Sequence, residues 1–140
     1  MSDGVKAERG AGTEELPFGA AELLSAVAGA GRVLDLGCGS GRLTVALARA
    51  GATVTGIDTS RERLEQARRR AGEGGVELQL LEADMNEPLP FGDGSFDAAT
   101  SRLALMAAAE PAATLGALRR GVVTGGRVAT VLWASLDLNP

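Results

Sequence analysis

The feature that most constrains the fold of this chain is a short apolar run that meets a cluster of glycines. Residues 33–36 read Val-Leu-Asp-Leu, and glycines follow at positions 37, 39 and 41. Apolar residues at helical spacing then run from position 43 to position 50. This order predicts a strand, a glycine-rich turn and a helix, with a nucleotide-like ligand lying against the main chain, because glycine has no side chain to obstruct it. The alternative is a glycine-rich turn with a purely structural role.

The alternation of strand and helix patterns continues along the chain. Such alternation produces a parallel sheet with right-handed crossovers and helices on both faces. The sequence therefore predicts an α/β fold with an open, mostly parallel sheet of about five strands, whose ligands bind beyond the carboxyl ends of the strands. The other expected strands are residues 53–57, 76–81, 96–101 and 127–133, and the expected helices are one that starts at residue 17, then 43–50, 59–72 and 111–120.

The helix expected at residues 59–72 has an apolar side and a polar side. Leu64, Ala67 and Ala71 recur at helical spacing and mark its inner face. Thr59 and Glu62 have the spacing of a capping box at its start. The remaining positions hold five arginines with glutamates interleaved, which are expected to form a solvated face. These are Arg61, Arg63, Arg68, Arg69 and Arg70.

Length and charge limit the class of protein. The chain has 140 residues, enough for one compact core and not for two. Residues 1–15 have little apolar content and are expected to be a flexible tail, which leaves residues 16–140 as the domain. A formal charge of -4 provides no positive field for nucleic acid. The sequence shows no long apolar run and no signal-peptide pattern, so a cytoplasmic protein without membrane contact is expected.

The residue types that are missing restrict the chemistry. The chain has no His and no Tyr, which removes the usual general base, most zinc sites and any Ser-His-Asp or Cys-His arrangement. Its single cysteine, Cys38, cannot form an internal disulfide and is expected to pack between two glycines rather than react. No metal site is expected, and no catalytic base is assigned.

Acidic residues lie at the ends of the first three predicted strands. Asp58 follows Gly37 by 21 residues, a spacing that suits a carboxylate accepting both hydroxyls of a ribose. Asp84, with the flexible Met85 beside it, could accept from an exocyclic amine while Met85 covers a ring face. Together with Asp35, these acids would line one edge of the sheet. The alternatives are that Asp58 only favours the start of a helix and that Asp84 is merely solvated.

Several motifs resemble, in their order along the chain, those of class I S-adenosylmethionine (SAM) dependent methyltransferases. The most specific is residues 33–43, and it is G-x-G-x-G, whereas the rival NAD-binding Rossmann proteins use G-x-G-x-x-G. The chain is most similar to the small-molecule branch that includes ubiquinone and menaquinone methyltransferases, over about residues 17–140. The further motifs are residues 54–60, 81–85, 89–91 with 96–98, and 125–127.

The resemblance implies SAM as the cofactor and a role for each motif. The glycine-rich motif would hold the methionine part, with its acid near the amino group, and Asp58 would take the ribose hydroxyls. Asp84 and the main chain of Met85 would read the adenine, while Ser101 and Arg102 would contact the methionine end or the acceptor. The implied cofactor-binding residues are Asp35, Gly37, Cys38, Gly39, Gly41, Asp58, Thr59, Asp84, Met85, Ser101 and Arg102.

The function implied is SAM-dependent methyl transfer to a small-molecule acceptor, as in small-molecule biosynthesis. The alternative is a non-catalytic or auxiliary methyltransferase-like subunit that binds a partner protein. The family's fold has two more strands after the fifth, and this Rossmann-like sheet is expected to lack them, as if truncated. The open edge of the fifth strand is therefore expected to pair with a second copy or a partner protein. Trp133, near its end, is expected in the core or at a covered edge.

Overall fold

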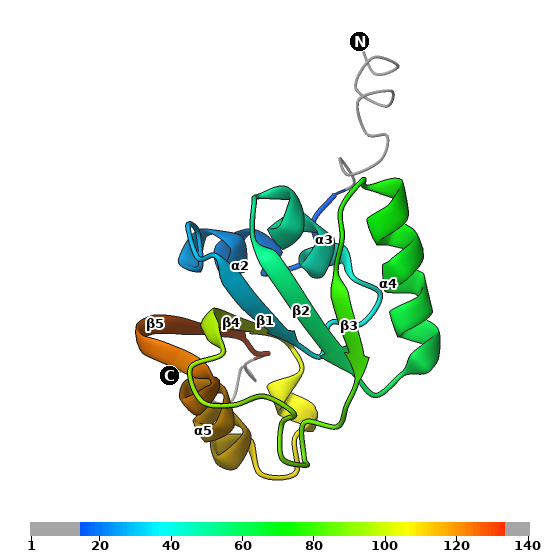
Figure 1. Cartoon of the computed structure of the whole chain (residues 1–140). Coiled ribbons are helices and arrows are strands. Elements are labelled where there is room, and N and C mark those ends of the chain that lie inside the picture. The colour runs from blue at the N-terminus through cyan, green and yellow to red at the C-terminus, as the bar shows by residue number, and fades with distance from the viewer. Residues whose placement is uncertain (1–14, 134–140) are drawn as a thin grey trace.

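The computed structural model of the chain describes residues 15–133, which form an open sheet of five parallel strands (Figure 1). Neighbouring strands lie in the order β3-β2-β1-β4-β5. This order confirms the predicted α/β fold. The tail expected at residues 1–15 lies outside the described residues except for its last position. The strands are β1 (Arg32–Leu36), β2 (Thr53–Asp58), β3 (Gln79–Glu82), β4 (Phe96–Arg102) and β5 (Val122–Val131).

Helices connect β1 to β2, β2 to β3 and β4 to β5, as the alternation of patterns predicted, whereas residues 83–95 between β3 and β4 form a loop. Pro111 occupies the first turn of its helix, where its missing N–H costs nothing. None of the helices within residues 15–133 is long and apolar enough to cross a membrane. The helices are α2 (Ala20–Ala26), α3 (Arg42–Arg49), α4 (Arg61–Glu73), α5 (Pro111–Gly121) and the 3-10 helix η1 (Leu105–Ala107).

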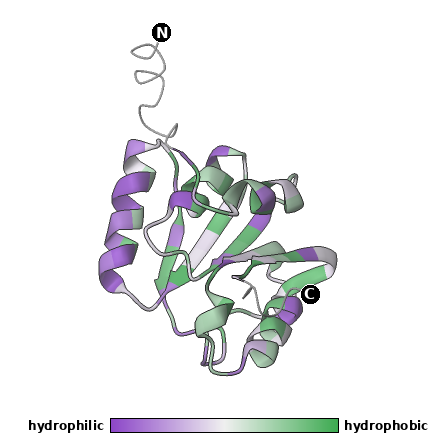
Figure 2. Ribbon diagram, turned by 180° about the vertical axis from the view of Figure 1, so that it is seen from behind, coloured by the Kyte–Doolittle hydropathy of each residue, from purple (hydrophilic) through white to green (hydrophobic). Residues whose placement is uncertain are grey.

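The core consists of two apolar layers, one on each face of the sheet. Val33 of β1 packs with Leu23 of α2 and Leu47 of α3, whereas its neighbour Leu34 packs on the other face with Leu118 of α5. Because both faces of β1 are covered, its sequence is a nearly continuous apolar run. Figure 2 shows hydrophobic colour along the central strands and hydrophilic colour along α4.

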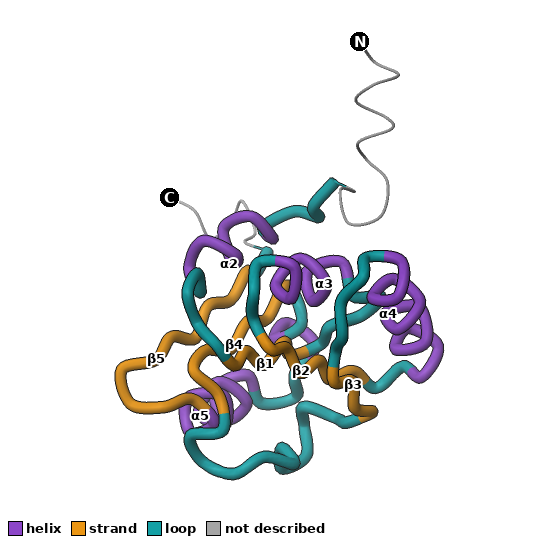
Figure 3. Tube along the Cα trace, turned by 45° about the horizontal axis from the view of Figure 1, so that its top comes forward, coloured by secondary structure: helices purple, strands orange, loops and turns teal. Residues whose placement is uncertain are grey.

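The layers are unequal in the number of helices. Figure 3 shows α2, α3 and α4 on one side of the sheet and α5 on the other. The cluster that contains Leu105 of η1 and Leu118 of α5 also includes Phe96, so η1 belongs to the α5 side. Loops that follow β3 supply the rest of that layer through Leu89 and Phe91.

The two outer strands differ from their predicted bounds. β3 begins at Gln79 rather than at residue 76, because its pairing with β2 starts only there, at the exposed edge of the sheet. β5 begins at Val122, which pairs with Phe96, and its register then shifts so that Arg127 pairs with Ala98. The residues between form an irregularity that the glycine-rich sequence accommodates, with Gly125 at a φ of 84°.

Trp133 is not in the core, contrary to expectation. β5 ends at Val131, so Trp133 lies beyond the ladder, and 59% of it is exposed. Its indole stacks on Phe18, with ring centroids 4.7 Å apart and planes 11° from parallel. The aromatic partner comes from the segment before α2, which no pattern near position 133 could reveal.

The start of α4 also corrects a prediction. Thr59 and Glu62 do not form a capping box, because the N-cap is Ser60, whose Oγ accepts the N–H of Arg63 at 3.2 Å. The Ser60 N–H in turn donates to Oδ1 of Asp58 at 2.8 Å. This contact holds Ser60 at the cap position, one residue after the predicted cap, Thr59.

Replacing Ser60 with Ala should lower the free energy of unfolding by about 1 kcal/mol, because the N–H of Arg63 loses its acceptor. Urea denaturation measures this loss. Thr59→Ala is the matched control and should cost less than half as much. Equal losses, or a larger loss for Thr59→Ala, would show that the cap is assigned to the wrong residue.

Candidate functional site

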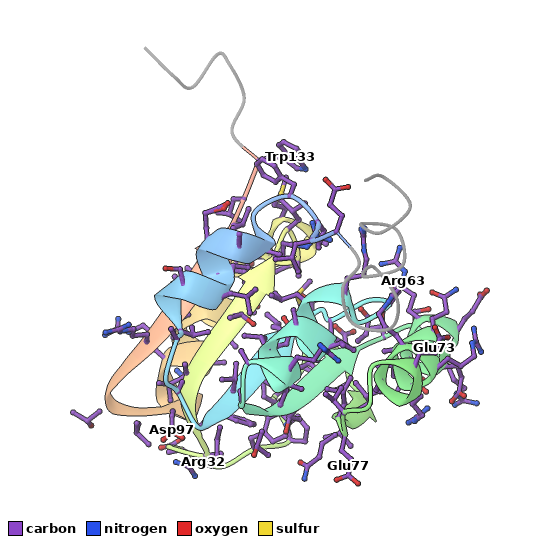
Figure 4. All side chains as sticks on the ribbon, turned by 90° about the horizontal axis from the view of Figure 1, so that it is seen from above. Arg32, Arg63, Glu73, Glu77, Asp97 and Trp133 are labelled. Carbon is purple, nitrogen blue, oxygen red and sulfur yellow. The ribbon has the colours of Figure 1, made fainter. Side chains whose placement is uncertain are left out.

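A cleft of about 590 Å³ opens at the carboxyl ends of β1, β2 and β4, where open parallel sheets bind their ligands. Its volume is within the range of small-molecule sites, roughly 300–1,000 Å³. Figure 4 shows Arg63 and Trp133 toward this edge of the sheet and Arg32 and Asp97 at the opposite one. Eight of the implied cofactor-binding residues line the cleft: Asp35, Gly37, Cys38, Gly39, Asp58, Thr59, Met85 and Arg102.

The other three implied residues, Gly41, Asp84 and Ser101, do not line the cleft. Gly41 is buried under α4, and a Cβ on it would lie 2.8 Å from the Cβ of Ala67. Asp84 is exposed, and its Oδ1 accepts the N–H of Asn86 at 2.8 Å. Ser101 is fully buried, and its Oγ has no hydrogen-bond partner among the described residues.

Within the glycine-rich turn, the glycines serve different purposes. A Cβ on Gly37 would lie 2.5 Å from the Cβ of Ala104, so this glycine admits the segment that follows β4. Gly41 likewise makes room for α4. At Gly39 only the mobile end of Arg63 comes near, at 3.7 Å. Gly39 is therefore the one glycine of the motif whose open side faces the cleft rather than packed protein.

The carboxylate of Asp58 connects the glycine-rich turn to α4. Its Oδ2 accepts the N–H of Gly39 at 2.9 Å, and its Oδ1 accepts the N–H of Ser60 at 2.8 Å. A carboxylate has about four acceptor sites, so each oxygen keeps one for a ligand. The alternative that Asp58 only favours the start of a helix is therefore correct in part. Its side chain does position α4, and it also faces the cleft.

Asp35 forms the floor of the cleft and is 2% exposed. Its two carboxyl oxygens accept the hydroxyls of Thr44 and Thr100 at 2.9 and 3.0 Å. Burial raises the pKa of Asp35 from 3.8 to about 6, against the opposing effect of these hydroxyls and of Arg102. The nearby Asp58 adds to the rise in pKa. A cationic ligand group above Asp35 would favour its charged form.

Cys38 is a packing residue, as its position between glycines predicted. Its side chain lies against β2, where a Cβ on Gly56 would come within 2.9 Å of Sγ. Burial raises the pKa of the Cys38 thiol to about 12, with Asp35 and Asp58 adding to the rise. The group is therefore a thiol at neutral pH and a poor nucleophile.

The exit of β4 shapes the side of the cleft opposite α4. Arg102 lines the cleft, and its Nη1 donates to the carbonyl oxygen of Phe18 at 3.3 Å. Leu103 has a φ of 62°, a left-handed conformation that costs a residue other than glycine on the order of 1–3 kcal/mol. Its N–H donates to the carbonyl of Val131 at 2.7 Å, which fixes the turn. Nothing in the sequence indicates this turn.

Sequence reasoning missed several polar residues of the cleft. Arg42, Arg63 and Gln66 line it, although Arg63 was expected to be only solvated. Arg63 and Gln66 are three residues apart at the start of α4, so helical spacing from the end of β2 could have identified them. Arg70 is only partly exposed, and its Nη1 donates to the carbonyl of Ser40 at 2.8 Å and holds the glycine-rich turn.

Known structures with this fold define the class. The chain superimposes on an S-adenosylmethionine-dependent methyltransferase from Mesorhizobium loti with a TM-score of 0.63 and 31% identity, covering 74% of this chain and 46% of that one. It matches the YcgJ protein of Bacillus subtilis with a TM-score of 0.70 and 29% identity, over 78% and 48% of the two chains. The fold is that of a SAM-dependent methyltransferase domain.

Residues 33–126 match the methyltransferase domain family, and the chain belongs to this family. It is also similar to the ubiquinone biosynthesis O-methyltransferase of Aeromonas salmonicida, with 42% identity over 97 residues, which are 69% of this chain and 41% of that protein. The chain spans between 37% and 44% of the length of such curated relatives. SAM is the cofactor of the domain.

The cleft residues fit SAM in shape and charge. Gly39 leaves its main chain open to the cleft, and each oxygen of Asp58 keeps an acceptor site for a ribose hydroxyl. Asp35 can oppose an ammonium, while Arg42 and Arg102 can oppose a carboxylate. A zwitterionic methionine group on an adenosine thus finds both signs of charge.

The raised pKa of Asp35 predicts a pH dependence of stability. The folded chain binds the Asp35 proton more tightly than the unfolded chain does, so protonation of Asp35 stabilises the folded state. This contribution to the free energy of unfolding is complete below about pH 4 and is lost as the pH rises through about 6. Asp35→Asn cannot titrate, and its amide can donate to the same hydroxyls. The unfolding free energy of the parent minus that of the variant should therefore fall between pH 4 and 7 in urea titrations. A difference that stays constant would contradict the raised pKa.

Proposed function

We propose that this domain transfers the methyl group of SAM to a small-molecule acceptor. The observation that carries the proposal is Asp58, whose carboxylate fixes the glycine-rich turn and the start of α4 and still offers acceptor sites to the cleft. SAM supplies a methyl group already activated on a sulfonium. The protein then has chiefly to bind and align the reactants, which can contribute several kcal/mol to catalysis.

The proposed cofactor contacts follow from the lining of the cleft. Asp58 would accept the ribose hydroxyls, and Asp35 would face the amino group of the methionine part. Met85, with Ala83, would cover the adenine, because both lie in the cleft beyond Asp58. Arg102 would oppose the methionine carboxylate. Asp84 and Ser101 keep supporting roles in this proposal, since neither side chain lines the cleft.

An acceptor that must lose a proton would release it to water or to a carboxylate, since the chain has no His or Tyr. The acids of the cleft already accept hydrogen bonds. Asp35 accepts two threonine hydroxyls, and Asp58 accepts two main-chain N–H groups. Acceptors that need little help in losing a proton therefore suit this site. The proposal includes a cytoplasmic role in small-molecule biosynthesis. The single, buried cysteine of the chain agrees with this location, because it cannot form an internal disulfide.

S-adenosylhomocysteine, the demethylated form of SAM, should bind the protein and raise its melting temperature, because a ligand of the folded state stabilises it by mass action. NADH should do neither. Isothermal titration calorimetry and thermal melts measure both. Tight binding of NADH without binding of SAM or S-adenosylhomocysteine would contradict the proposed function.

The variant that tests the ribose contact is Asp58→Ala. It removes a charged acceptor and should weaken binding of S-adenosylhomocysteine by about 1–3 kcal/mol. Asp84→Ala is the matched control, since Asp84 lies outside the cleft lining, and it should cost less. Melting temperatures without ligand separate weaker binding from a loosened glycine-rich turn. An unchanged affinity in a folded Asp58→Ala variant would leave Asp58 with a structural role only.

We also propose that the free edge of β5 associates with a second copy of the chain. Within residues 15–133, β5 pairs only with β4; its Thr130 is exposed, and the strand contains no proline. An unpaired strand edge favours pairing with another chain. Light scattering at micromolar concentration should show a dimer, and Thr130→Lys should weaken it by placing a charge on the edge. A monomer that turns over an acceptor alone would refute the association.

A further inference from the structure

Two buried threonines bind the carboxyl group at the floor of the cleft from behind. Asp35 is 2% exposed, and Thr44 of α3 and Thr100 of β4 are fully buried. The Thr44 hydroxyl donates to Oδ2 of Asp35 at 2.9 Å, and the Thr100 hydroxyl donates to Oδ1 at 3.0 Å. Asp35 lines the cleft, whereas neither threonine does. The two hydroxyls can therefore act on a ligand only through Asp35.

The two donors come from different elements and engage different oxygens, which fixes the plane of the carboxyl group. Thr100 lies in register with Asp35 on the neighbouring strand, and Thr44 is in the helix that follows the glycine-rich turn. A carboxylate has about four acceptor sites, so each oxygen keeps one after it has accepted a threonine hydroxyl. Because Asp35 is part of the cleft lining, these remaining sites are available to a ligand.

A threonine hydroxyl suits Asp35 in both of its protonation states. The hydroxyl donates to the charged carboxylate, and it can rotate to accept the proton of the neutral acid. Burial raises the pKa of Asp35 to about 6, and donation by the hydroxyls of Thr44 and Thr100 opposes that rise. Without these donors the pKa of Asp35 would be higher still.

The other charged groups near Asp35 have smaller effects on its pKa than the threonines have. Arg102 of β4 lowers the pKa of Asp35, and Asp58 of β2 raises it. The thiol of Cys38 has a pKa of about 12 and stays neutral. The remaining charged side chains that line the cleft are permanent cations, Arg42 of α3 and Arg63 of α4. The threonines are therefore the groups that most favour the charged form of Asp35.

We propose that Thr44 and Thr100 are positioning residues that hold Asp35 charged and directed into the cleft, where it takes up the ammonium group of the cofactor. This inference rests on the proposed methyl transfer, in which Asp35 faces the amino group of the methionine part of SAM. An ammonium above the carboxyl favours its charged form, so a neutral Asp35 releases its proton to solvent when the cofactor binds. The cleft therefore loses affinity for the cofactor as the pH falls.

Calorimetry on the full chain tests this pH dependence with S-adenosylhomocysteine, which keeps the ammonium and carboxylate of the methionine part between pH 5 and 7. The parent should bind about tenfold more weakly at pH 5 than at pH 7, because most Asp35 carboxyls are protonated at the lower pH. Asp35→Asn should bind weakly, with an affinity that stays constant over this range. Equal affinity of the parent at pH 5 and pH 7 would overturn the proposal.

The variants that test the threonines are Thr44→Val and Thr100→Val, which replace a hydroxyl with a methyl group of similar size. At pH 6 each should bind S-adenosylhomocysteine about fivefold more weakly than the parent, since the charged form of Asp35 loses a donor. At pH 7 the difference should shrink to less than about twofold, whereas a merely structural loss would be the same at both pH values. Thr44→Ser and Thr100→Ser keep the hydroxyl and should restore the parent profile.

Thr55→Val is the matched control. Thr55 is also buried, but its hydroxyl donates to Oε1 of Gln79 on β3 at 3.2 Å, away from Asp35. This variant should have the pH profile of the parent. A valine variant at position 44 or 100 that is weakened equally at pH 6 and pH 7, or that the serine does not restore, would contradict the positioning role.

A second measurement needs no ligand. The side-chain carboxyl carbon of Asp35, followed by NMR in ¹³C-labelled protein, should titrate near pH 6 in the parent and at higher pH in both valine variants. An unmoved midpoint in a folded valine variant would overturn the proposal, and either variant suffices if the other does not fold. If S-adenosylhomocysteine does not bind the parent at any pH, the proposed function fails, and the carbon titration still decides whether the threonines hold the charge of Asp35.

Discussion

The carboxylate of Asp58 is the contact on which the cleft depends. It accepts one N–H from Gly39 and one from Ser60, so a single side chain at the end of β2 holds the glycine-rich turn and the start of α4. Both hydrogen bonds have a charged acceptor, which makes them stronger than neutral ones. The turn has few side chains of its own to fix it, and its shape is therefore set by this neighbour and by Arg70, which holds Ser40.

Beneath that contact, a second acid connects three elements from within the core. Asp35 of β1 accepts hydroxyls from Thr44 of α3 and Thr100 of β4. Burial raises its pKa to about 6, so Asp35 takes up a proton at a higher pH than an exposed carboxyl does. The two acids thus have different electrostatic roles. Asp58 is partly buried and organises main-chain donors, whereas Asp35 is enclosed and can respond to a cation placed above it.

The β4 strand determines the rest of the cleft through its two ends. At its start, Asp97 accepts the main-chain N–H and the guanidinium of Arg32, which holds β4 beside β1 and keeps the pKa of Asp97 below its usual value. At its exit, the left-handed Leu103 turns the chain so that the following residues pack against Gly37. The same turn brings η1 next to the exposed aromatic pair. One side of the cleft is therefore built on β4, which pairs with β1 on the side opposite β2.

The sequence by itself determined the α/β order of elements, because apolar runs and helical spacing report burial that is local to each segment. It also indicated Asp35, Gly39 and Asp58, since strand ends of a parallel sheet meet at one edge. Tertiary structure alone decided that Gly37 and Gly41 admit Ala104 and Ala67, and that Trp133 stacks on Phe18. These outcomes depend on contacts between segments distant in sequence, and no local pattern encodes such a contact.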